Sequence, residues 1–304
     1  MEKNQLGTSD LFVSKLGLGC MSLGTDENKA KDIIKSAIDE GINYLDTADL
    51  YDFGMNEEIV GKSVKSIRDQ VIIATKVGNR WNNNQTSWIW DPSKAYVKEA
   101  VKSSLKRLQT DYIDLYQLHG GTLEDPIDET IEAFEELISE GLIRYYGISS
   151  IRPNVIRNYV EKSNIVSVML QYSLLDRRSE ESILSLLREN QISVVTRGPL
   201  AKGILSENAL NKIPKEGYLD YSYDEILELI NNIKGKLIKN DRTMTEVSLQ
   251  FNLANQTVAS VIAGVSTIHQ MKENVKAIQG NPLTKEEYNL LKEWSKQNLY
   301  TSHR

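Results

Sequence analysis

The stretch "NYLDTADLYDFGMNE", residues 43–57, begins as a buried strand and then changes character. Tyr44 and Leu45 are apolar or amphipathic, but Asp46, Asp49 and Tyr51 follow within a few positions. Aspartate at the end of a strand is commonly a turn or cap residue. A strand that carries a carboxylate and a phenol out of a core also supplies an active site in a parallel barrel. The rest of the chain decides between these two interpretations.

Short apolar runs recur along the chain between segments of helical period. Pro92 and Ser93 suit the start of one such helix, and Gly141 suits the end of another. The predicted strands are residues 15–20, 42–46, 71–76, 113–119, 143–149, 165–171, 192–197 and 258–264.

This repetition favours one α/β domain over residues 1–304, a (β/α)8 TIM barrel, because each predicted strand is followed by a helical segment. The wide gap before the last strand predicts an extra loop near residues 218–223, and residues 283–297 predict an extra C-terminal helix. A doubly wound dinucleotide-binding sheet is less consistent with the chain, because "GLGCMSLG" lacks the third glycine of the G-x-G-x-x-G fingerprint.

The composition is that of a soluble globular protein, with 40% hydrophobic and 26% charged residues among 304. A net charge of -6 gives no reason to expect nucleic acid or an anionic membrane as a partner. The single cysteine, Cys20, has no internal disulfide partner, which predicts a reducing, cytoplasmic setting. The polar first residues lack the core of a signal peptide, and no apolar stretch reaches the length of about 18 residues that spans a membrane. Nothing in the sequence indicates an oligomeric state.

Polar side chains stand at the carboxyl ends of the predicted strands, where the active site of such a barrel lies. Each has an ordinary alternative: Lys76 would otherwise emerge into solvent, and Tyr51 is one of 14 tyrosines. His119 is harder to set aside, because it is one of three histidines and ends an apolar run. In chain order these strand-end residues are Asp46, Lys76, His119, Ser149, Gln171 and Arg197.

Together these residues suit proton transfer to a carbonyl group. A lysine beside a tyrosine favours the phenolate, so Lys76 is expected to lower the pKa of Tyr51. Asp46 would keep that lysine charged, and His119 would hydrogen-bond a carbonyl oxygen. The hydride would come from a cofactor. No metal site is expected, because the chain has no Cys and His cluster at metal spacing, and it also lacks the G-x-S-x-G turn of serine hydrolases.

At this point the sequence resembles the aldo-keto reductase family over nearly its whole length. The resemblance rests on "LGLGCMSLG", "GINYLDTADLY", "NEEIVGKSV", "VIIATKVG", "SLKRLQTDYIDLYQLH", "GLIRYYGISS", "QYSLLDRR", "GPLAKGIL" and "VIAGVSTIHQMKENVKAI". It implies an NADPH-dependent carbonyl reductase whose catalytic residues are Asp46, Tyr51, Lys76 and His119, with Tyr51 as the general acid.

The resemblance also implies the cofactor-binding residues. Ser149, Ser150 and Gln171 would hold the nicotinamide carboxamide, and the segment 199–205 would hold the pyrophosphate. The adenosine end would be held by Gly264, Ser266, Gln270 and Asn274. The residues implied are Gly19, Cys20, Met21, Asp46, Ser149, Ser150, Gln171, Arg197, Gly198, Pro199, Leu200, Lys202, Gly203, Leu205, Gly264, Ser266, Gln270 and Asn274.

Three departures from the family pattern bear on the cofactor. Ser150 stands where asparagine is usual, and Arg197 aligns with a residue that is aromatic in many relatives and stacks on the nicotinamide. Ser266 and Gln270 are neutral where Arg or Lys often meets the 2′-phosphate, although Lys272 is near. NADPH is therefore the expected cofactor, with NADH as a second option.

The loop after the third predicted strand carries Trp81, Trp88 and Trp90, three of the chain's four tryptophans. They predict an aromatic wall for a small aldehyde or ketone, with packing against the barrel as the alternative for each. Cys20 is expected to be a packing residue more than a redox switch. Two other functions are consistent with the sequence: a cofactor-sensing regulatory subunit with slow turnover, and a polyol or alcohol dehydrogenase working in the oxidative direction.

Overall fold

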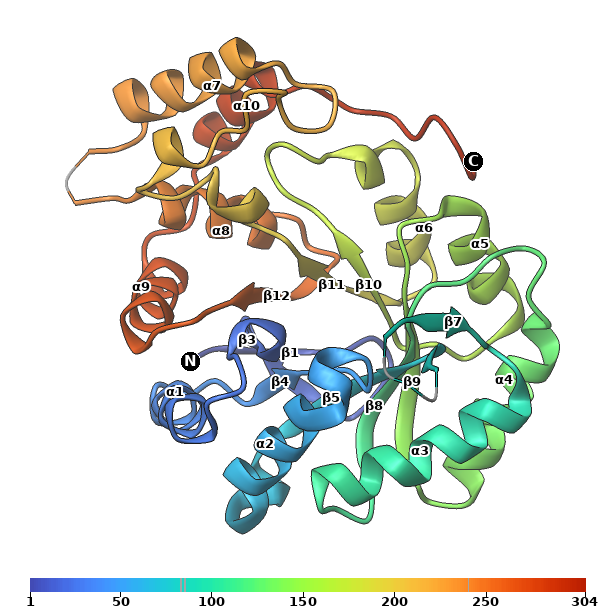
Figure 1. Ribbon diagram of the computed structural model, residues 1–304. Helices are drawn as coiled ribbons and strands as arrows, with labels where there is room; N and C mark the ends of the chain where they lie inside the picture. Colours follow the sequence, from blue (N-terminus) through green and yellow to red (C-terminus); the bar gives the residue numbers. More distant parts are fainter. Residues whose placement is uncertain (83, 85, 240) are drawn as a thin grey trace.

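Eight parallel strands form a closed barrel at the centre of the molecule (Figure 1). The computed structural model describes every residue except 83, 85 and 240. Each strand pairs with its neighbour in chain order, and the barrel closes where β12 pairs with β3 through Gly264 and Gly19. The predicted (β/α)8 barrel is confirmed. Its strands are β3 (Leu16–Gly19), β4 (Tyr44–Asp46), β5 (Ile72–Val77), β8 (Ile113–Leu118), β9 (Ile143–Ser149), β10 (Ser167–Gln171), β11 (Ser193–Arg197) and β12 (Val258–Gly264).

Helices surround this barrel, and local sequence signals explain where several of them begin and end. Ser93 caps α3 by accepting a hydrogen bond from the backbone N–H of Tyr96 at 3.3 Å. Gly141 follows α4 with a left-handed φ of 73°, which glycine adopts at low cost. The helices are α1 (Glu27–Asp39), α2 (Met55–Val64), α3 (Lys94–Leu108), α4 (Ile127–Ser139), α5 (Pro153–Lys162), α6 (Ile183–Glu189), α7 (Tyr223–Lys236), α8 (Met244–Leu253), α9 (Ile268–Gln279) and α10 (Lys285–Trp294).

The wide gap before the last strand contains two helices, α7 and α8. The expected loop at residues 218–223 is the turn that leads into α7, and Ser222 with Glu225 forms a capping box there. The predicted C-terminal helix is α10, which lies beside α7 on the outside of the molecule (Figure 1).

Two β-hairpins lie outside the barrel sheet and were not predicted from the sequence. The first joins β1 (Lys3–Gln5) to β2 (Phe12–Ser14) and contacts the N-terminal ends of the barrel strands through hydrogen bonds to Asn43 and Ser193. The second joins β6 (Asn79–Trp81) to β7 (Trp88–Trp90) and follows β5. All these strands are only three residues long, so they carry little hydrophobic periodicity.

The barrel interior changes from apolar to polar along the strands. Tyr44 and Leu115 belong to a buried hydrophobic cluster that also contains Leu6 and Leu11 of the first hairpin. Because side chains alternate in and out along a strand, the next inward position after Tyr44 is Asp46, and the next after Ala74 is Lys76. The carboxyl ends of neighbouring strands therefore bring polar groups together above an apolar plug.

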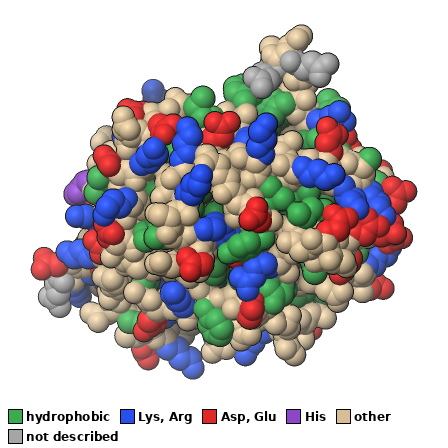
Figure 2. Space-filling model, turned by 90° about the horizontal axis from the view of Figure 1, so that it is seen from below, with side chains coloured by type: hydrophobic (Ala, Val, Ile, Leu, Met, Phe, Trp, Pro, Cys, Tyr) green, Lys and Arg blue, Asp and Glu red, His purple; other side chains and the backbone are tan. Residues whose placement is uncertain are grey.

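The surface mixes both signs of charge. Lys and Arg side chains lie among Asp and Glu side chains over the face seen in Figure 2, with hydrophobic side chains between them. Within the described part of the chain, no helix is long and apolar enough to cross a membrane.

Candidate active site

Four of the predicted site residues come together at the carboxyl ends of three adjacent strands. Asp46 ends β4, Lys76 lies near the end of β5, and His119 directly follows β8. Tyr51 opens a short 3-10 turn, Tyr51–Gly54, in the loop after β4. Strand β4 and the loop that follows it therefore bring a carboxylate and a phenol to the barrel mouth.

Lys76 is the centre of this group. Its Nζ lies 2.8 Å from each carboxylate oxygen of Asp46 and 2.7 Å from the backbone carbonyl oxygen of Thr47. A third contact reaches the Tyr51 Oη at 3.4 Å. An ammonium group has three N–H donors, so these acceptors complete its hydrogen bonding. With 1% of its surface exposed, Lys76 is a fully buried and fully paired cation.

The pKa values of this pair reflect burial and mutual attraction. Burial works against the charge of Lys76, but Asp46 and Tyr51 outweigh it and raise the pKa of the lysine. Burial raises the pKa of Asp46, while the charge of Lys76 acts in the opposite direction. The pKa of Lys76 is raised because the Asp46 carboxylate, the Thr47 carbonyl oxygen and the Tyr51 hydroxyl surround its ammonium group. Lys76 is therefore positively charged at neutral pH.

Tyr51 is less acidic than the sequence suggested. Burial raises its pKa above the ordinary value, Lys76 lowers it, and Asp46 raises it again. The expectation that Lys76 would bring the pKa of the phenol below its usual value is wrong for the net effect, because burial of the ring is the larger influence. A tyrosine with a raised pKa keeps its proton at neutral pH, as a proton donor must.

His119 faces Tyr51 edge to face, with ring centroids 6.0 Å apart. Burial, together with the charges of Lys76 and Arg197, lowers the pKa of His119 to about 3. The imidazole is therefore neutral at physiological pH. Its Nδ1 has no hydrogen-bond partner among the described residues, although buried polar atoms are normally paired. A neutral imidazole can donate one hydrogen bond to a ligand oxygen without carrying charge.

Gln171 and Arg197 lie at the ends of the neighbouring strands β10 and β11 and are directly paired in register. Arg197 donates from Nη1 to the Gln171 Oε1 at 3.1 Å, and the Gln171 Nε2 donates to Asp176 at 2.8 Å and to the Tyr218 Oη at 3.2 Å. Arg197 is exposed, yet its charge acts on Asp46, Tyr51 and His119. Asp176 and Tyr218 were not predicted from the sequence, because neither stands at a strand end.

A loop with unusual backbone geometry follows Arg197. Gly198, Ala201, Lys202 and Gly203 all have left-handed φ angles, from 45° to 92°. These angles keep the chain from forming a regular helix. Backbone hydrogen bonds hold the loop in a tight turn, including those from the Ala201 N–H to the Gly198 carbonyl oxygen at 3.0 Å and from the Gly203 N–H to the Leu200 carbonyl oxygen at 2.8 Å. Leu205, at the end of this loop, is fully buried. Its N–H donates to the Leu200 carbonyl oxygen at 3.1 Å, and its carbonyl oxygen accepts from the Ser248 hydroxyl at 3.1 Å.

The remaining residues assigned to the cofactor differ in exposure. Met21 is 62% exposed, whereas the side chain of Cys20 is fully buried in the core, which matches the expectation of a packing residue. Ser149 ends β9 and Ser150 follows it, and both are buried. Asn274 is buried in the middle of α9. Ser266 and Gln270 hydrogen-bond each other at the start of α9, where both are exposed.

These donors fit a nicotinamide dinucleotide chemically. The Gln171 amide and the hydroxyl of Ser149 suit a carboxamide, and the Arg197 guanidinium with the loop after β11 suits phosphate oxygens. The exposed N-terminus of α9, with its positive dipole end, suits a further phosphate. The side chains at the barrel mouth are therefore consistent with the nicotinamide cofactor that the sequence implies.

Comparison with known proteins decides the family. A profile of the Aldo/keto reductase family matches residues 15–296. The chain belongs to the aldo/keto reductase family. It is an NAD(P)H-dependent oxidoreductase acting on small molecules.

Two curated relatives of this aldo-keto reductase show how far the similarity extends. An uncharacterized oxidoreductase of Bacillus subtilis, YqkF, is 59% identical over the whole of both chains. The NADH-specific methylglyoxal reductase of Escherichia coli is 30% identical. The aligned region covers 92% of this chain and 94% of that protein. Among solved structures, the holo form of the aldo-keto reductase AKR11C1 from Bacillus halodurans is 58% identical and superposes with a TM-score of 0.95. The superposed region covers 100% of this chain and 99% of that chain.

The tryptophans of this aldo-keto reductase have distinct surroundings. Trp81 packs against Phe53, two residues after Tyr51, with ring centroids 4.4 Å apart. Trp88 is half exposed on β7. Trp90 donates its indole N–H to Asp125 at 2.8 Å and covers Gly78 and Gly120, where a Cβ would lie only 2.5 Å and 3.2 Å from its ring. Trp81 therefore lies beside the turn that carries Tyr51, and Trp90 braces two loops.

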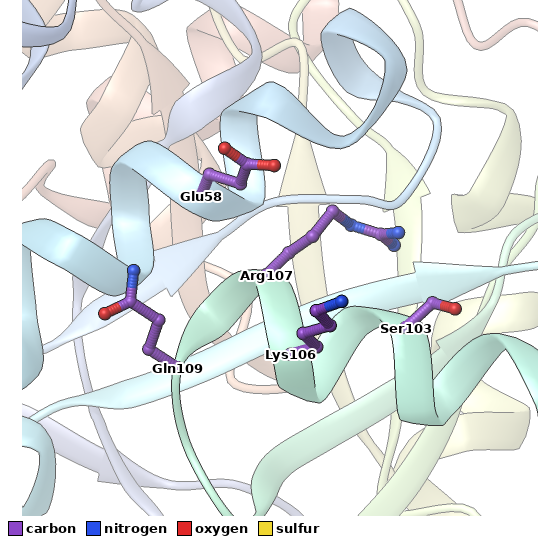
Figure 3. A pocket seen from close by; sticks show the side chains of 5 residues that line it. All are labelled: Glu58, Ser103, Lys106, Arg107 and Gln109. Carbon is purple, nitrogen blue, oxygen red and sulfur yellow. The ribbon is translucent and has the colours of Figure 1, made fainter.

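A separate surface cavity lies away from the barrel mouth. It is lined by residues of α2 and α3, namely Glu58, Ser103, Lys106, Arg107 and Gln109 (Figure 3). It contains none of the residues described above, so we assign it no part in substrate or cofactor binding. Among the described residues no cluster of His, Cys, Asp and Glu suits a metal ion.

Proposed function

We propose that this aldo-keto reductase reduces small aldehydes or ketones to alcohols with NADPH, and that Tyr51 donates the proton. The observation that carries the proposal is the contact between the Lys76 Nζ and the Tyr51 Oη at 3.4 Å, inside a buried group that includes Asp46. A protonated phenol beside a fixed cation supports proton donation, because the cation stabilises the negative charge that the phenol acquires.

Each residue then has a separate task. Neutral His119 would donate a hydrogen bond to the carbonyl oxygen and so orient it toward Tyr51. The bound nicotinamide would supply the hydride to the carbonyl carbon. Tyr51 would give its proton to the carbonyl oxygen, and Lys76 would stabilise the resulting phenolate. Asp46 would keep Lys76 charged and in place. The products are one alcohol and one oxidised cofactor, and a proton from solvent would restore the Tyr51 hydroxyl before the next turnover.

The cofactor preference follows from charge. Arg197 is an exposed cation at the end of β11, and a guanidinium is flat enough to lie against a nicotinamide ring. Its charge would favour the reduced ring over the oxidised, cationic one. Ser266 and Gln270 provide only neutral groups near the 2′-phosphate, and the related Escherichia coli enzyme is named as NADH-specific. The positive charge of Arg197 would also favour the phosphate-bearing cofactor, so we propose NADPH as the preferred cofactor. Because Ser266 and Gln270 are neutral, we propose NADH as an accepted one.

The substrate side of the proposal rests on the aromatic pair near Tyr51. Phe53 is 50% exposed and Trp81 lies against it, so the pair presents apolar surface next to the phenol. An apolar wall of this kind suits a small aldehyde or ketone with an aromatic or aliphatic group. Trp88 and the exposed Ile89 of the same hairpin would extend this wall outward.

The experiment is turnover with a cofactor that is deuterated at the transferable position of nicotinamide C4. With a nitrobenzaldehyde as substrate, we expect one deuterium on the former carbonyl carbon of each alcohol formed. A matched series with NADPH and NADH gives the cofactor preference, and a series of polyols with oxidised cofactor tests the oxidative direction. Cofactor binding without turnover of any carbonyl compound would contradict the proposal and indicate a regulatory subunit.

A further inference from the structure

The turn that carries Tyr51 has a backbone that its own sequence does not favour. Asp52, Phe53 and Gly54 have left-handed φ angles of 48°, 57° and 88° in succession. Residues with a Cβ adopt this region at a cost in free energy, and a run of such residues is rare. Surrounding contacts must therefore hold the turn in this shape.

Arg107 supplies one such contact from the far end of α3. A Cβ on Gly54 would lie 2.6 Å from the Arg107 Cδ and 2.7 Å from its Nε. The arginine side chain therefore occupies the space beside Gly54, where only a glycine leaves room. Arg107 thus packs directly against the last residue of the Tyr51 turn.

Glu57 connects this arginine to the strand that carries Lys76. Its Oε2 accepts a hydrogen bond from the Arg107 Nε at 2.6 Å, and its Oε1 accepts one from the Thr75 hydroxyl at 2.5 Å. Glu57 is completely buried, so Arg107 and Thr75 satisfy the hydrogen bonding of its two carboxylate oxygens in place of water. Thr75 is the neighbour of Lys76 in β5.

We propose that Gly54, Glu57 and Arg107 form a clamp that fixes the distance between Tyr51 and Lys76, so that Glu57 and Arg107 are positioning residues for proton transfer. This inference rests on the proposed function, because it assumes that Tyr51 is the proton donor. The clamp holds the turn through Gly54 and β5 through Thr75. Neither Glu57 nor Arg107 lies in the barrel interior with the four residues of the active site; they act from the layer between barrel and helices.

The outer side of the clamp is open to solvent. Arg107 lines the surface cavity between α2 and α3 together with Lys106 (Figure 3). The arginine side chain is 24% exposed, whereas Glu57 is not exposed at all. A small cation added to a variant that lacks the guanidinium can therefore reach Glu57 from outside, without passing through the active site.

The test is a double-mutant cycle between Arg107→Met and Tyr51→Phe. In the wild-type background, we expect Arg107→Met to lower kcat by about 10-fold or more, because a small displacement of a catalytic group has a large effect on rate. The dissociation constant of NADPH should change by less than about twofold, since the clamp does not contact the cofactor residues. In the Tyr51→Phe background, the same substitution should leave the residual rate nearly unchanged.

Three further measurements separate positioning from loss of structure. Lys106 lines the same cavity but does not hydrogen-bond Glu57, so Lys106→Met is the control and should retain the wild-type kcat. Methylguanidinium at millimolar concentration should restore part of the kcat of Arg107→Ala and none of that of Tyr51→Phe. Arg107→Lys keeps the charge if Arg107→Met fails to fold, and it should show the same selective loss of kcat with an unchanged melting temperature.

The clamp is overturned if Arg107→Met leaves kcat unchanged, or if it lowers the rate by the same factor in both backgrounds. Wild-type turnover by Tyr51→Phe alone would overturn the proposed function, and the clamp with it. That result is visible before Arg107 is changed, so the two failures are distinguishable.

Discussion

His119 combines two properties: its imidazole is largely shielded from solvent, and the charges of Lys76 and Arg197 act on it. Both work against protonation, and the pKa falls to about 3. The side chain can then serve as a hydrogen-bond donor whose charge does not change with pH in the physiological range. At the residue scale, this is the feature of the site that most affects its pH dependence.

The lowered pKa makes stability depend on pH in a defined window. Between pH 6.5 and pH 3 the unfolded chain binds a proton at position 119 and the folded protein does not. The contribution of His119 is therefore complete above pH 6.5 and is lost as the pH falls. Relative to His119→Gln, we expect the wild-type free energy of unfolding to fall by about 2 kcal/mol more between pH 7.5 and pH 5. Urea titrations at a series of pH values measure this, and parallel curves for the two proteins would contradict it.

Some residues could be assigned from the sequence and others could not. Asp46, Lys76 and His119 were predictable, because ionisable residues at the ends of apolar strands are unusual and a parallel barrel brings strand ends together. Asp176 and Arg107 were not, since their partners Gln171 and Glu57 become neighbours only through turns and helix packing. The pKa of Tyr51 was predicted in the wrong direction, because burial cannot be judged from neighbouring residue types.

At the scale of elements, α2 and α3 pack so closely that one glycine determines their separation. A Cβ on Gly61 of α2 would lie 2.3 Å from the carbonyl oxygen of Leu108, the last residue of α3. The close approach brings Arg107 within reach of Glu57 and Gly54. The spacing of these two helices therefore influences the turn that carries Tyr51.

Gly61→Ala should force the helices apart and destabilise the protein by about 1–3 kcal/mol, the usual cost of overpacking. Gly235→Ala is the matched control, because Gly235 is exposed in α7 and nothing lies near its missing Cβ. There alanine should stabilise the helix by up to about 1 kcal/mol. Thermal and urea unfolding of the two variants give the comparison. Equal stability changes of the same sign would show that the packing of α2 on α3 is not tight.

The eight barrel strands were predictable as elements because each lies within a largely apolar run of five to seven residues that is followed by a segment of helical period. The hairpins β1–β2 and β6–β7 were not, because three-residue strands carry almost no periodic pattern. The second hairpin holds Trp81 and Trp88, so the structure adds a defined scaffold to what the sequence showed only as an aromatic loop.

At the scale of the whole molecule, the barrel converts positions far apart in the chain into one site. Residues 46, 76, 119, 171 and 197 come from five strands and meet at one end, while the first hairpin contacts the other. The ionisable groups at the carboxyl ends of the strands pack against the buried hydrophobic cluster inside the barrel, which fixes their positions. The loops outside the strand ends can vary while the strands that hold Asp46 and Lys76 stay in place.

The central claim is that Tyr51 donates the proton in carbonyl reduction. The most direct measurement is single-turnover reduction of a nitrobenzaldehyde by wild type and Tyr51→Phe, each saturated with NADPH, alongside the NADPH dissociation constant of each. Removing one hydroxyl leaves the ring and its packing in place, so we expect cofactor binding to be nearly unchanged and the rate to fall by about 10² or more, the scale of general acid catalysis. A Tyr51→Phe rate near that of the wild type would contradict the account.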